Sequence, residues 1–340
     1  MAVKPKREKG VRWGKKREDK RVWPAYNEEL VVRGRFLLDV EWVKSWDKEL
    51  AKMNKGKRGA PFEFPESLIK LQAVWNQLVG VRQVEGITRD FVATAKIPDF
   101  NDYSTINRRI QKLDLTFELP KHGFCSISTD GTGMKMHNAG EYRQIKYGNK
   151  KKRWIEVVIS ANPFTKDLLN VDVNMDGEGR GEPEIAMQHL NSLWNKGITV
   201  DKFWGDGKFD VIDLFNLLEG HGTESAIPPR DNASDTANGS MRRAREVAEY
   251  KLKTWDDWAR DKQYGKRWLG TEGIIASVKG VFGEHTRAKT AENACLEAAR
   301  KFWAYEKMRK YAKVQARKPQ SLFLTELCNT PSEHNTFINH

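Results

Sequence analysis

The chain has 340 residues, and its 59 Lys and Arg against 46 Asp and Glu give a formal net charge of +13. This length exceeds the ~150 residues of a typical domain, and the positive charge favours a polyanionic partner. The three cysteines lie far apart without a Cys-x-x-Cys pair, which argues against a disulfide framework and a structural zinc site. No apolar run reaches the roughly 18 residues of a membrane span, and no apolar secretion signal begins the chain. We therefore expect a soluble cytoplasmic protein with no membrane partner.

The N-terminal segment carries many charges and almost nothing to bury. Such a segment is either a solvated tail or an arm that becomes ordered on phosphates. From Tyr26 the apolar spacing becomes helical, and residues 54–65 contain the glycines and prolines of a linker. We predict a basic disordered arm over residues 1–25 and a helical DNA-binding region over residues 26–120.

Three helices are predicted after the linker, over residues 65–78, 81–95 and 105–113, the last with Ser104 as its N-cap. The third helix combines an apolar seam with an outward basic face, as a DNA recognition helix requires. A helix-turn-helix DNA-binding unit and a plain helical bundle both fit this pattern. The candidate DNA-binding residues are Arg108, Arg109 and Lys112.

Residues 124–133 alternate as a short, half-buried strand that ends on Asp130. Gly131 and Gly133 follow and let the chain turn sharply. A carboxylate fixed at a strand end can hold a divalent metal, although Asp also ends many strands for structural reasons alone. Further strands are expected to continue an antiparallel meander. They lie at residues 141–146, 153–160 and 168–174.

The segment that starts at Asp172 begins like the calcium-binding loop of an EF-hand. Its twelfth position, which must supply a bidentate Glu, is Pro183. We therefore reject calcium binding there and expect a connection into a helix.

A later segment, residues 198–210, repeats the sequence pattern found around Asp130. A strand ends on Asp206, a glycine follows, and a helix comes next. Two strand ends of this kind favour a shared metal site, although both can also be simple turns.

From Glu272 onward, apolar residues recur at helical spacing, and Lys279 lies two turns further on nearly the same side. Such a pair could supply one metal ligand and one phosphate contact, or it could belong to a solvated face. A last helix over residues 290–313 is expected to pack on the sheet, and residues 316–340 are expected to form a tail.

In combination these residues resemble the DDE transposases of prokaryotic, archaeal-type insertion sequences, of the families numbered four and five. The resemblance lies in Asp130 in a strand, in Asp206 within Gly-Asp-Gly-Lys-Phe-Asp, and in Glu272 within Glu-x6-Lys-x2-Phe-Gly-Glu. It covers residues 26–315. It implies an α/β fold with a ribonuclease H-like catalytic domain over residues 121–315, whose five-stranded mixed sheet is flanked by helices.

The resemblance also implies the chemistry. Asp130, Asp206 and Glu272 would hold two Mg²⁺ or Mn²⁺ ions for in-line phosphoryl transfer, which cuts transposon ends and joins them to target DNA. The partners would be double-stranded DNA, as terminal inverted repeats and as target, and a second copy of the chain, in the nucleoid. Two alternatives keep the fold: a catalytically silent DNA-binding regulator, and a metal-dependent nuclease that does not join strands.

Lys279 matches the lysine of the family's Tyr-Arg-Glu-Lys signature and would contact a phosphate. Tyr264 and Arg267 would supply its first two residues, although four residues separate Arg267 from Glu272 where the family commonly has three. Glu284 is a rival for the catalytic glutamate. We prefer Glu272 because the downstream lysine and the Phe-Gly-Glu sequence then fall in the family's spacing.

Overall fold

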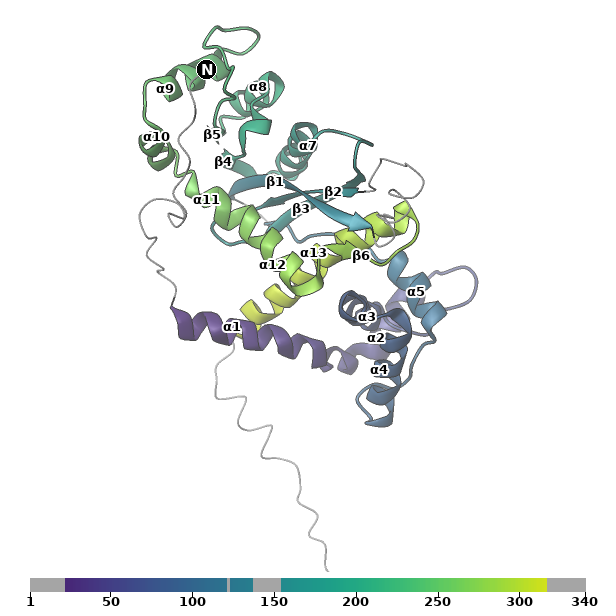
Figure 1. Cartoon of the computed structure of the whole chain (residues 1–340). Helices are drawn as coiled ribbons and strands as arrows, with labels where there is room; N and C mark the ends of the chain where they lie inside the picture. The colour runs from purple at the N-terminus through teal and green to yellow at the C-terminus, as the bar shows by residue number, and fades with distance from the viewer. Residues whose placement is uncertain (1–21, 121–122, 137–153, 317–340) are drawn as a thin grey trace, which may run out of the picture. The chain divides into compact units, whose positions relative to one another are not determined.

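The computed structural model describes residues 22–120, 123–136 and 154–316 (Figure 1). Most of the predicted arm, the tail from residue 317 and the predicted strand at 141–146 lie outside these ranges. The described chain forms two compact units. The larger is Asp39–Met308, and the smaller combines the described residues up to Leu38 with those from Arg309 onward. No helix within the described ranges is both long enough and apolar enough to cross a bilayer.

The smaller unit contains α1 (Trp23–Arg35), the short 3₁₀ helix η1 (Phe36–Leu38) and the last residues of α13 (Ala291–Gln315). The ring of Phe36 packs edge-on against Tyr311, with 5.3 Å between ring centroids. This aromatic contact joins the two segments of the unit.

The larger unit begins with a helical region whose polar centre is buried. The side-chain amide of Gln72 donates to Asn101 Oδ1 at 2.5 Å and to Thr88 Oγ1 at 3.2 Å. The last helix is capped by Asp102, which accepts from the backbone N–H groups of Ser104 and Thr105, so the prediction of Ser104 as N-cap is wrong. The helices are η2 (Glu41–Ser45), α2 (Trp46–Asn54), α3 (Glu66–Leu78), α4 (Val81–Ala93) and α5 (Tyr103–Gln111).

A mixed sheet follows, with strand order β3-β2-β1-β4-β5. The first three strands are antiparallel, whereas β4 and β5 run parallel to β1. The predicted mixed α/β sheet is confirmed, and a two-residue strand, β6, adds a sixth member beside β1. The strands are β1 (Phe124–Met136), β2 (Trp154–Ala161), β3 (Leu168–Met175), β4 (Thr199–Trp204), β5 (Glu224–Ala226) and β6 (His285–Thr286).

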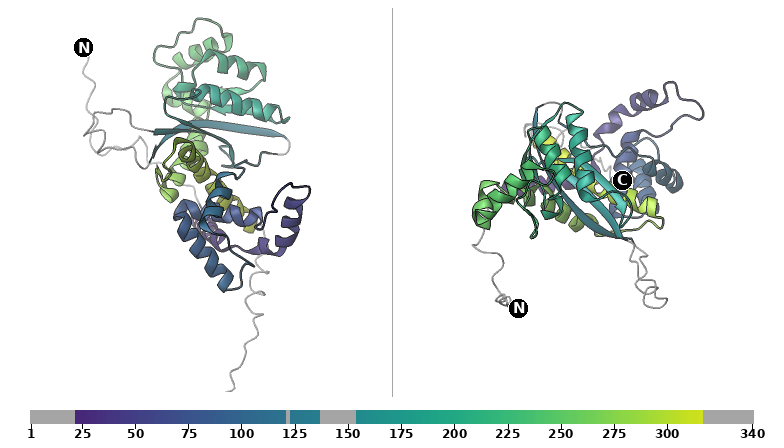
Figure 2. Two further views of the ribbon diagram at one scale, coloured as in Figure 1. Left: turned by 90° about the vertical axis from the view of Figure 1, so that its right-hand side faces the viewer. Right: turned by 90° about the horizontal axis from the view of Figure 1, so that it is seen from above.

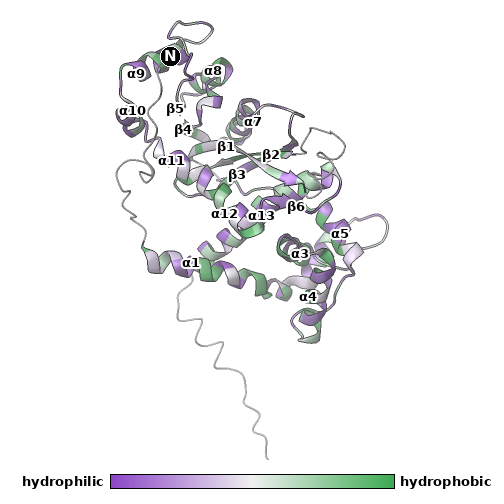
Figure 3. Ribbon diagram, in the orientation of Figure 1, coloured by the Kyte–Doolittle hydropathy of each residue, from purple (hydrophilic) through white to green (hydrophobic). Residues whose placement is uncertain are grey.

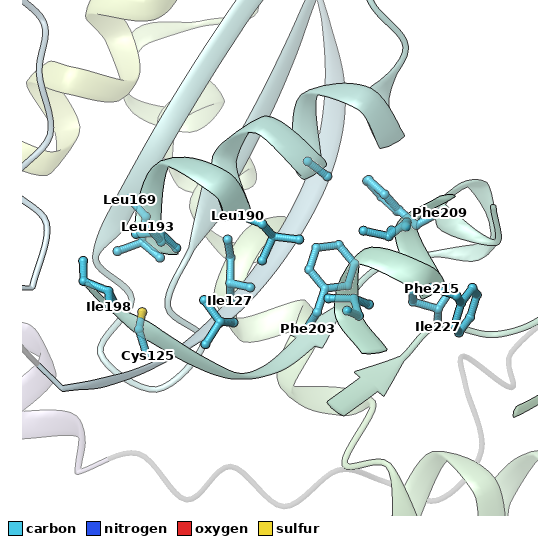
Figure 4. Packing of buried hydrophobic residues seen from close by; sticks show 14 residues of the cluster. Cys125, Ile127, Leu169, Leu190, Leu193, Ile198, Phe203, Phe209, Phe215 and Ile227 are labelled. Atoms are coloured by element: carbon cyan, nitrogen blue, oxygen red, sulfur yellow. The ribbon is translucent and has the colours of Figure 1, made fainter. Parts of the chain in front are cut away.

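Helices cover both faces of the sheet. α7 (Glu182–Trp194) and α8 (Ile212–Gly220) lie on one face, and α12 (Gly273–Phe282) lies on the other (Figures 1 and 2). On the first face Ile127 of β1 and Phe203 of β4 pack with side chains of the two helices (Figure 4). Those partners are Leu190, Leu193, Leu214 and Phe215. Between β5 and α12 the chain forms α9 (Met241–Lys251) and α10 (Trp255–Asp261).

Strand β1 does not turn after Asp130, as the glycines suggested, but continues to Met136. Gly131 and Gly133 pair with Val158 and Glu156 of β2. Both glycines are needed for space, because a Cβ at Gly131 would lie 2.6 Å from the Glu182 carboxylate and one at Gly133 would lie 3.2 Å from the Trp154 ring. Tertiary crowding, and not a turn, therefore explains the two glycines.

The other edge of β1 is paired in two separate stretches. Pairing with β4 ends where Ser128 meets Trp204, and pairing with β6 begins at Lys135. The intervening residues, which include Asp130, have no strand neighbour on that edge among the described residues. The backbone edge of β1 beside Asp130 is therefore not covered by a described strand.

The end of α12 is fixed by a buried lysine of α13, a helix along which hydrophilic and hydrophobic residues are mixed (Figure 3). Lys301 is 1% exposed and donates to the carbonyl oxygens of Phe282 at 2.9 Å, Gly283 at 3.0 Å and His285. Gly283 ends the helix with a φ of +75°. Burial lowers the pKa of Lys301 to about 8.

Lys301→Met should reduce the free energy of unfolding by about 1–3 kcal/mol, because three carbonyl oxygens at the end of α12 lose their donor. Thermal unfolding followed by circular dichroism measures the change. Lys289→Met, at an exposed position, is the control and should shift the stability by less than about 0.5 kcal/mol. Equal stability of the two variants would contradict the capping role of Lys301.

Candidate active site

Asp206 follows the end of β4. Gly205 makes this turn possible, because a Cβ there would lie 2.7 Å from the Phe209 ring. The Asp206 carboxylate then accepts from the backbone N–H of Lys208 at 2.8 Å and begins the 3₁₀ helix η3 (Gly207–Phe209). The carboxylate is thus held beside the carboxyl end of β4, next to the edge of β1 that carries Asp130.

Glu272 lies within a helix and not at its start, which corrects the sequence-based expectation. The helix runs through α11 (Gly265–Arg267), the π-helical turn η4 (Trp268–Glu272) and α12 without a break. A π turn closes i→i+5 hydrogen bonds and so accommodates one extra residue. It brings Arg267 and Glu272, five positions apart, to the same side of the helix, which accounts for the additional residue between them.

The π turn packs tightly against the sheet through Gly270. A Cβ at this position would lie 3.0 Å from Ser128 Cβ and 3.0 Å from Pro163. Because Ser128 is two residues before Asp130 on β1, this close approach fixes the distance between the turn and the strand. The glycine is a packing requirement, not a helix breaker.

Arg267 bridges two of the three predicted catalytic carboxylates. Its Nη1 donates to Asp130 Oδ2 at 2.9 Å, and its Nη2 donates to Glu272 Oε1. The Arg267 side chain is 16% exposed, against 13% for Asp130 and 34% for Glu272. The structure therefore brings Asp130 and Glu272 together around one guanidinium.

Electrostatics connect Asp206 to the same cluster. Burial, together with the negative charges of Asp206 and Glu272, raises the pKa of Asp130 to about 6, although Arg267 acts in the opposite direction. Burial also raises the pKa of Tyr264 to about 12. Burial first, and the neighbouring carboxylates second, thus disfavour the ionised form of Asp130.

The groups around Arg267 stabilise its protonated, positively charged form. Burial alone would lower the pKa of Arg267, but Tyr264, Asp130, Glu272 and Asp206 outweigh it and raise the pKa. The guanidinium also lies over the Tyr264 ring, 5.5 Å from its centroid. The tyrosine and arginine predicted from the signature are therefore both at the cluster.

A cavity of about 540 Å³ opens beside the bridge. Asp130, Glu272 and Lys279 line it, and so does Glu284, the rival glutamate. In the described part of the chain, no three His, Cys, Asp or Glu side chains already surround a common point as a metal site. The oxygen-only donors nevertheless fit a hard cation such as Mg²⁺ or Mn²⁺.

The predicted DNA-binding residues of α5 differ in exposure. Arg108 and Lys112 are exposed, as predicted. Arg109 is half-buried over the ring of Phe62, with 4.5 Å to the ring centroid, and burial lowers its pKa. Arg109 therefore packs within the helical region and does not face outward as predicted.

Sequence reasoning missed two charged residues next to the cluster. Glu182 begins α7, and its Oε1 accepts from Lys208 Nζ at 2.7 Å. Lys208 stands two positions after Asp206, which is a local signal, whereas nothing near Glu182 in the sequence indicates its contact with β1. A third omission is the buried Asp210, whose two carboxylate oxygens accept from Arg243 of α9 at 2.6 and 2.9 Å.

A Ser-His-Asp arrangement lies elsewhere under α7. Ser160 Oγ is 2.7 Å from His189 Nδ1, and His189 Nε2 is 3.1 Å from Asp172 Oδ2. Thr129 Oγ1 lies 2.7 Å from Ser160 Oγ. Ser160 and Thr129 are completely buried, so no substrate reaches this serine. The arrangement supports the strand beside Asp130 and is not a nucleophilic triad.

Comparison with known protein families bears on this cluster. Two family models match the chain, and both are described as a transposase DDE domain. One matches residues 31–139, and the other matches residues 122–306, which is more than half of the chain. The chain belongs to the transposase DDE-domain family. The resemblance to DDE transposases is thereby confirmed, and the family implies a nuclease or transferase enzyme.

Among solved structures, the DDE-domain chain is similar to the cryo-EM structure of a piggyBac transposase synaptic complex with hairpin DNA. The identity is 11%, the match covers 92% of this chain and 87% of that chain, and the TM-score is 0.25. A TM-score this low carries no argument about the present fold or site, which rest on the strand pairings and contacts described above.

Asp130→Asn should stabilise the metal-free transposase domain above pH 6. Because the folded-state pKa of Asp130 is raised to about 6, its contribution to stability is complete below pH 4 and is lost as the pH rises through 6. Asparagine cannot ionise and so avoids this loss of unfolding free energy. The loss is roughly 1–3 kcal/mol, at 1.36 kcal/mol per unit of pKa. Thermal unfolding in EDTA at pH 4.5 and pH 7.5 measures it, with exposed Asp213→Asn as control. A variant no more stable than wild type at pH 7.5 contradicts the assignment.

Gly270→Ala should disturb the site through the π turn, because the new methyl group forces the turn away from Ser128 and Pro163. We expect a loss of about 1–3 kcal/mol in unfolding free energy. Gly280→Ala in α12 is the matched control, since a Cβ there meets nothing within 4 Å. Alanine at Gly280 should be neutral or stabilising by up to about 1 kcal/mol. A harmless Gly270→Ala would show that the close approach is not needed.

Proposed function

We propose that the protein is an active transposase that cuts transposon-end DNA and joins the ends to target DNA, with Asp130, Asp206 and Glu272 as the catalytic carboxylates. One observation carries the proposal: Arg267 bridges Asp130 and Glu272, while Asp206 acts electrostatically on Asp130, all within the residues matched as a transposase DDE domain. Clustered, partly buried carboxylates are costly to a fold and mark a functional site.

The three carboxylates would hold Mg²⁺ or Mn²⁺ ions, two of them by analogy with the family. When bound, such ions make a water or a 3′-hydroxyl more nucleophilic and stabilise the leaving oxygen during in-line attack at phosphorus. Asp130, Asp206 and Glu272 would together supply the carboxylate oxygens that hold these ions.

Cationic residues around the carboxylates would position the DNA. Lys279 lines the same cavity as Asp130 and Glu272 and would contact a phosphate near the cut. Arg267 keeps the carboxylates together and presents a planar donor suited to a second phosphate. Tyr264, which is largely buried, would fix the orientation of the guanidinium.

Other parts of the chain would bind DNA outside the catalytic site. We propose the basic arm (1–25) and the helical region (26–120) as the segments that recognise terminal repeats, with Arg108 and Lys112 exposed for contact. Arg109 would act there by packing against Phe62. The catalytic domain would comprise residues 121–315 and the tail residues 316–340. Synapsis of two ends would require a homodimer on double-stranded DNA.

The proposal is tested with purified protein and labelled DNA that carries the terminal repeats flanking the gene, in EDTA, Mg²⁺ or Mn²⁺. We expect metal-dependent cleavage and joined products. Asp130→Ala, Asp206→Ala and Glu272→Ala should each reduce cleavage by about 1,000-fold or more while DNA binding survives. Glu284→Ala separates the two candidate glutamates, because it should retain cleavage.

The exposed Asp213→Ala is the control and should cleave as wild type does. Cleavage that persists in all three carboxylate variants would refute the assignment of the site. Binding without cutting by the wild type would favour a silent regulator, and cutting without joining would favour a nuclease.

A further inference from the structure

Glu182 is the first residue of α7 and faces the sheet. A carboxylate is an unusual side chain at such a buried position. The Glu182 side chain is only 9% exposed, and its carboxylate lies against the backbone of β1, where a Cβ at Gly131 would come within 2.6 Å. Oε1 accepts from Lys208, whereas Oε2 is buried without a hydrogen-bond partner. A buried carboxylate depends strongly on the cation that pairs with it.

Lys208 is attached to the site in two ways. Its backbone N–H donates to the Asp206 carboxylate at 2.8 Å, and its Nζ donates to Glu182 at 2.7 Å. Its pKa is raised, first by the hydrogen bond to Glu182, and further by the charges of Asp206 and Asp130, which outweigh the opposing effect of burial. The Lys208 ammonium is therefore stabilised by the negative charges of both Asp206 and Asp130.

The contact lies where the sheet itself no longer holds the two aspartates together. The parallel pairing of β1 and β4 ends at Ser128 and Trp204, two residues before Asp130 and Asp206 respectively. Beyond that point no described ladder hydrogen bond joins the two segments. A chain of contacts between the two segments runs from Gly131 through Glu182 and Lys208 to Asp206.

We propose that the Glu182–Lys208 ion pair is a positioning element that sets the separation of the Asp130 and Asp206 carboxylates and thereby the metal affinity of the site. This inference rests on the proposed function, because it assigns a role relative to the carboxylates that would hold the metal. Glu182 and Lys208 act through Asp130 and Asp206 and are not themselves assigned as ligands.

The residues around the Glu182–Lys208 ion pair favour a positioning role for the pair over a role as a second metal-binding site. The ion pair lines a cavity of about 370 Å³ on the α7 side of β1, together with Glu156 and Asp176. Burial and the neighbouring Glu182 raise the pKa of Glu156. Lys208 is thus the cation that compensates this acidic wall, and its loss leaves Glu182 buried and unpaired.

The test compares Glu182→Gln, Lys208→Met and the double variant Glu182→Gln/Lys208→Met with wild type. Mn²⁺ binding to the full chain without DNA is measured by calorimetry, and cleavage is separated into kcat and KM for DNA. We expect each single variant to bind Mn²⁺ about 10-fold more weakly or worse and to lose kcat with little change in KM. Glu184→Gln, exposed on the same helix, is the control and should match wild type.

The double variant guards against misfolding, because it leaves no unpaired buried charge. Its Mn²⁺ affinity should fall no further than that of the weaker single variant, which is the non-additivity expected of one interacting pair. Wild-type Mn²⁺ affinity in Glu182→Gln and in the double variant would overturn the inference while the proposed function stands. Failure of the wild-type protein to bind Mn²⁺, or Mn²⁺ binding that Asp130→Ala leaves unchanged, would overturn both.

Discussion

The structure of the site depends on one guanidinium placed between two carboxylates. Like charges held close together in a partly buried site repel each other. Arg267 offsets that repulsion between Asp130 and Glu272 and joins β1 to the helix that carries Glu272. The π turn, the close packing of Gly270 and the lysine that caps the end of α12 all hold this helix in the position that the bridge requires.

The sheet shows which strands could be predicted from the alternation of apolar and polar residues alone. Two predicted strands, at 153–160 and 168–174, agree with β2 and β3 to within one residue at each end, because each alternates without interruption. The predicted end of β1 at Asp130 was wrong, because Gly131 and Gly133 carry a local preference for turns that led to the prediction. Their neighbours across the fold, Glu182 and Trp154, are not visible from the local sequence and override that preference.

The site was predictable to the extent that its residues stand in local patterns. Asp130 and Asp206 followed from strands that meet Asp-Gly sequences, whereas the choice of Glu272 rested on the spacing of the family that the chain resembles. Long-range pairs gave no such signal: Glu182 and Lys208 are 26 positions apart and meet only because α7 returns over β1. The catalytic roles of all these residues remain predictions.

The π turn has a consequence for how related chains are found. A helix that widens by one residue keeps its arginine and glutamate in contact while changing the number of letters between them. A search pattern with a fixed three-residue interval therefore rejects this chain, although the two side chains meet in space. A pattern that allows one additional residue at this interval, with glycine inside it, would include chains in which a π turn keeps the arginine and the glutamate in contact.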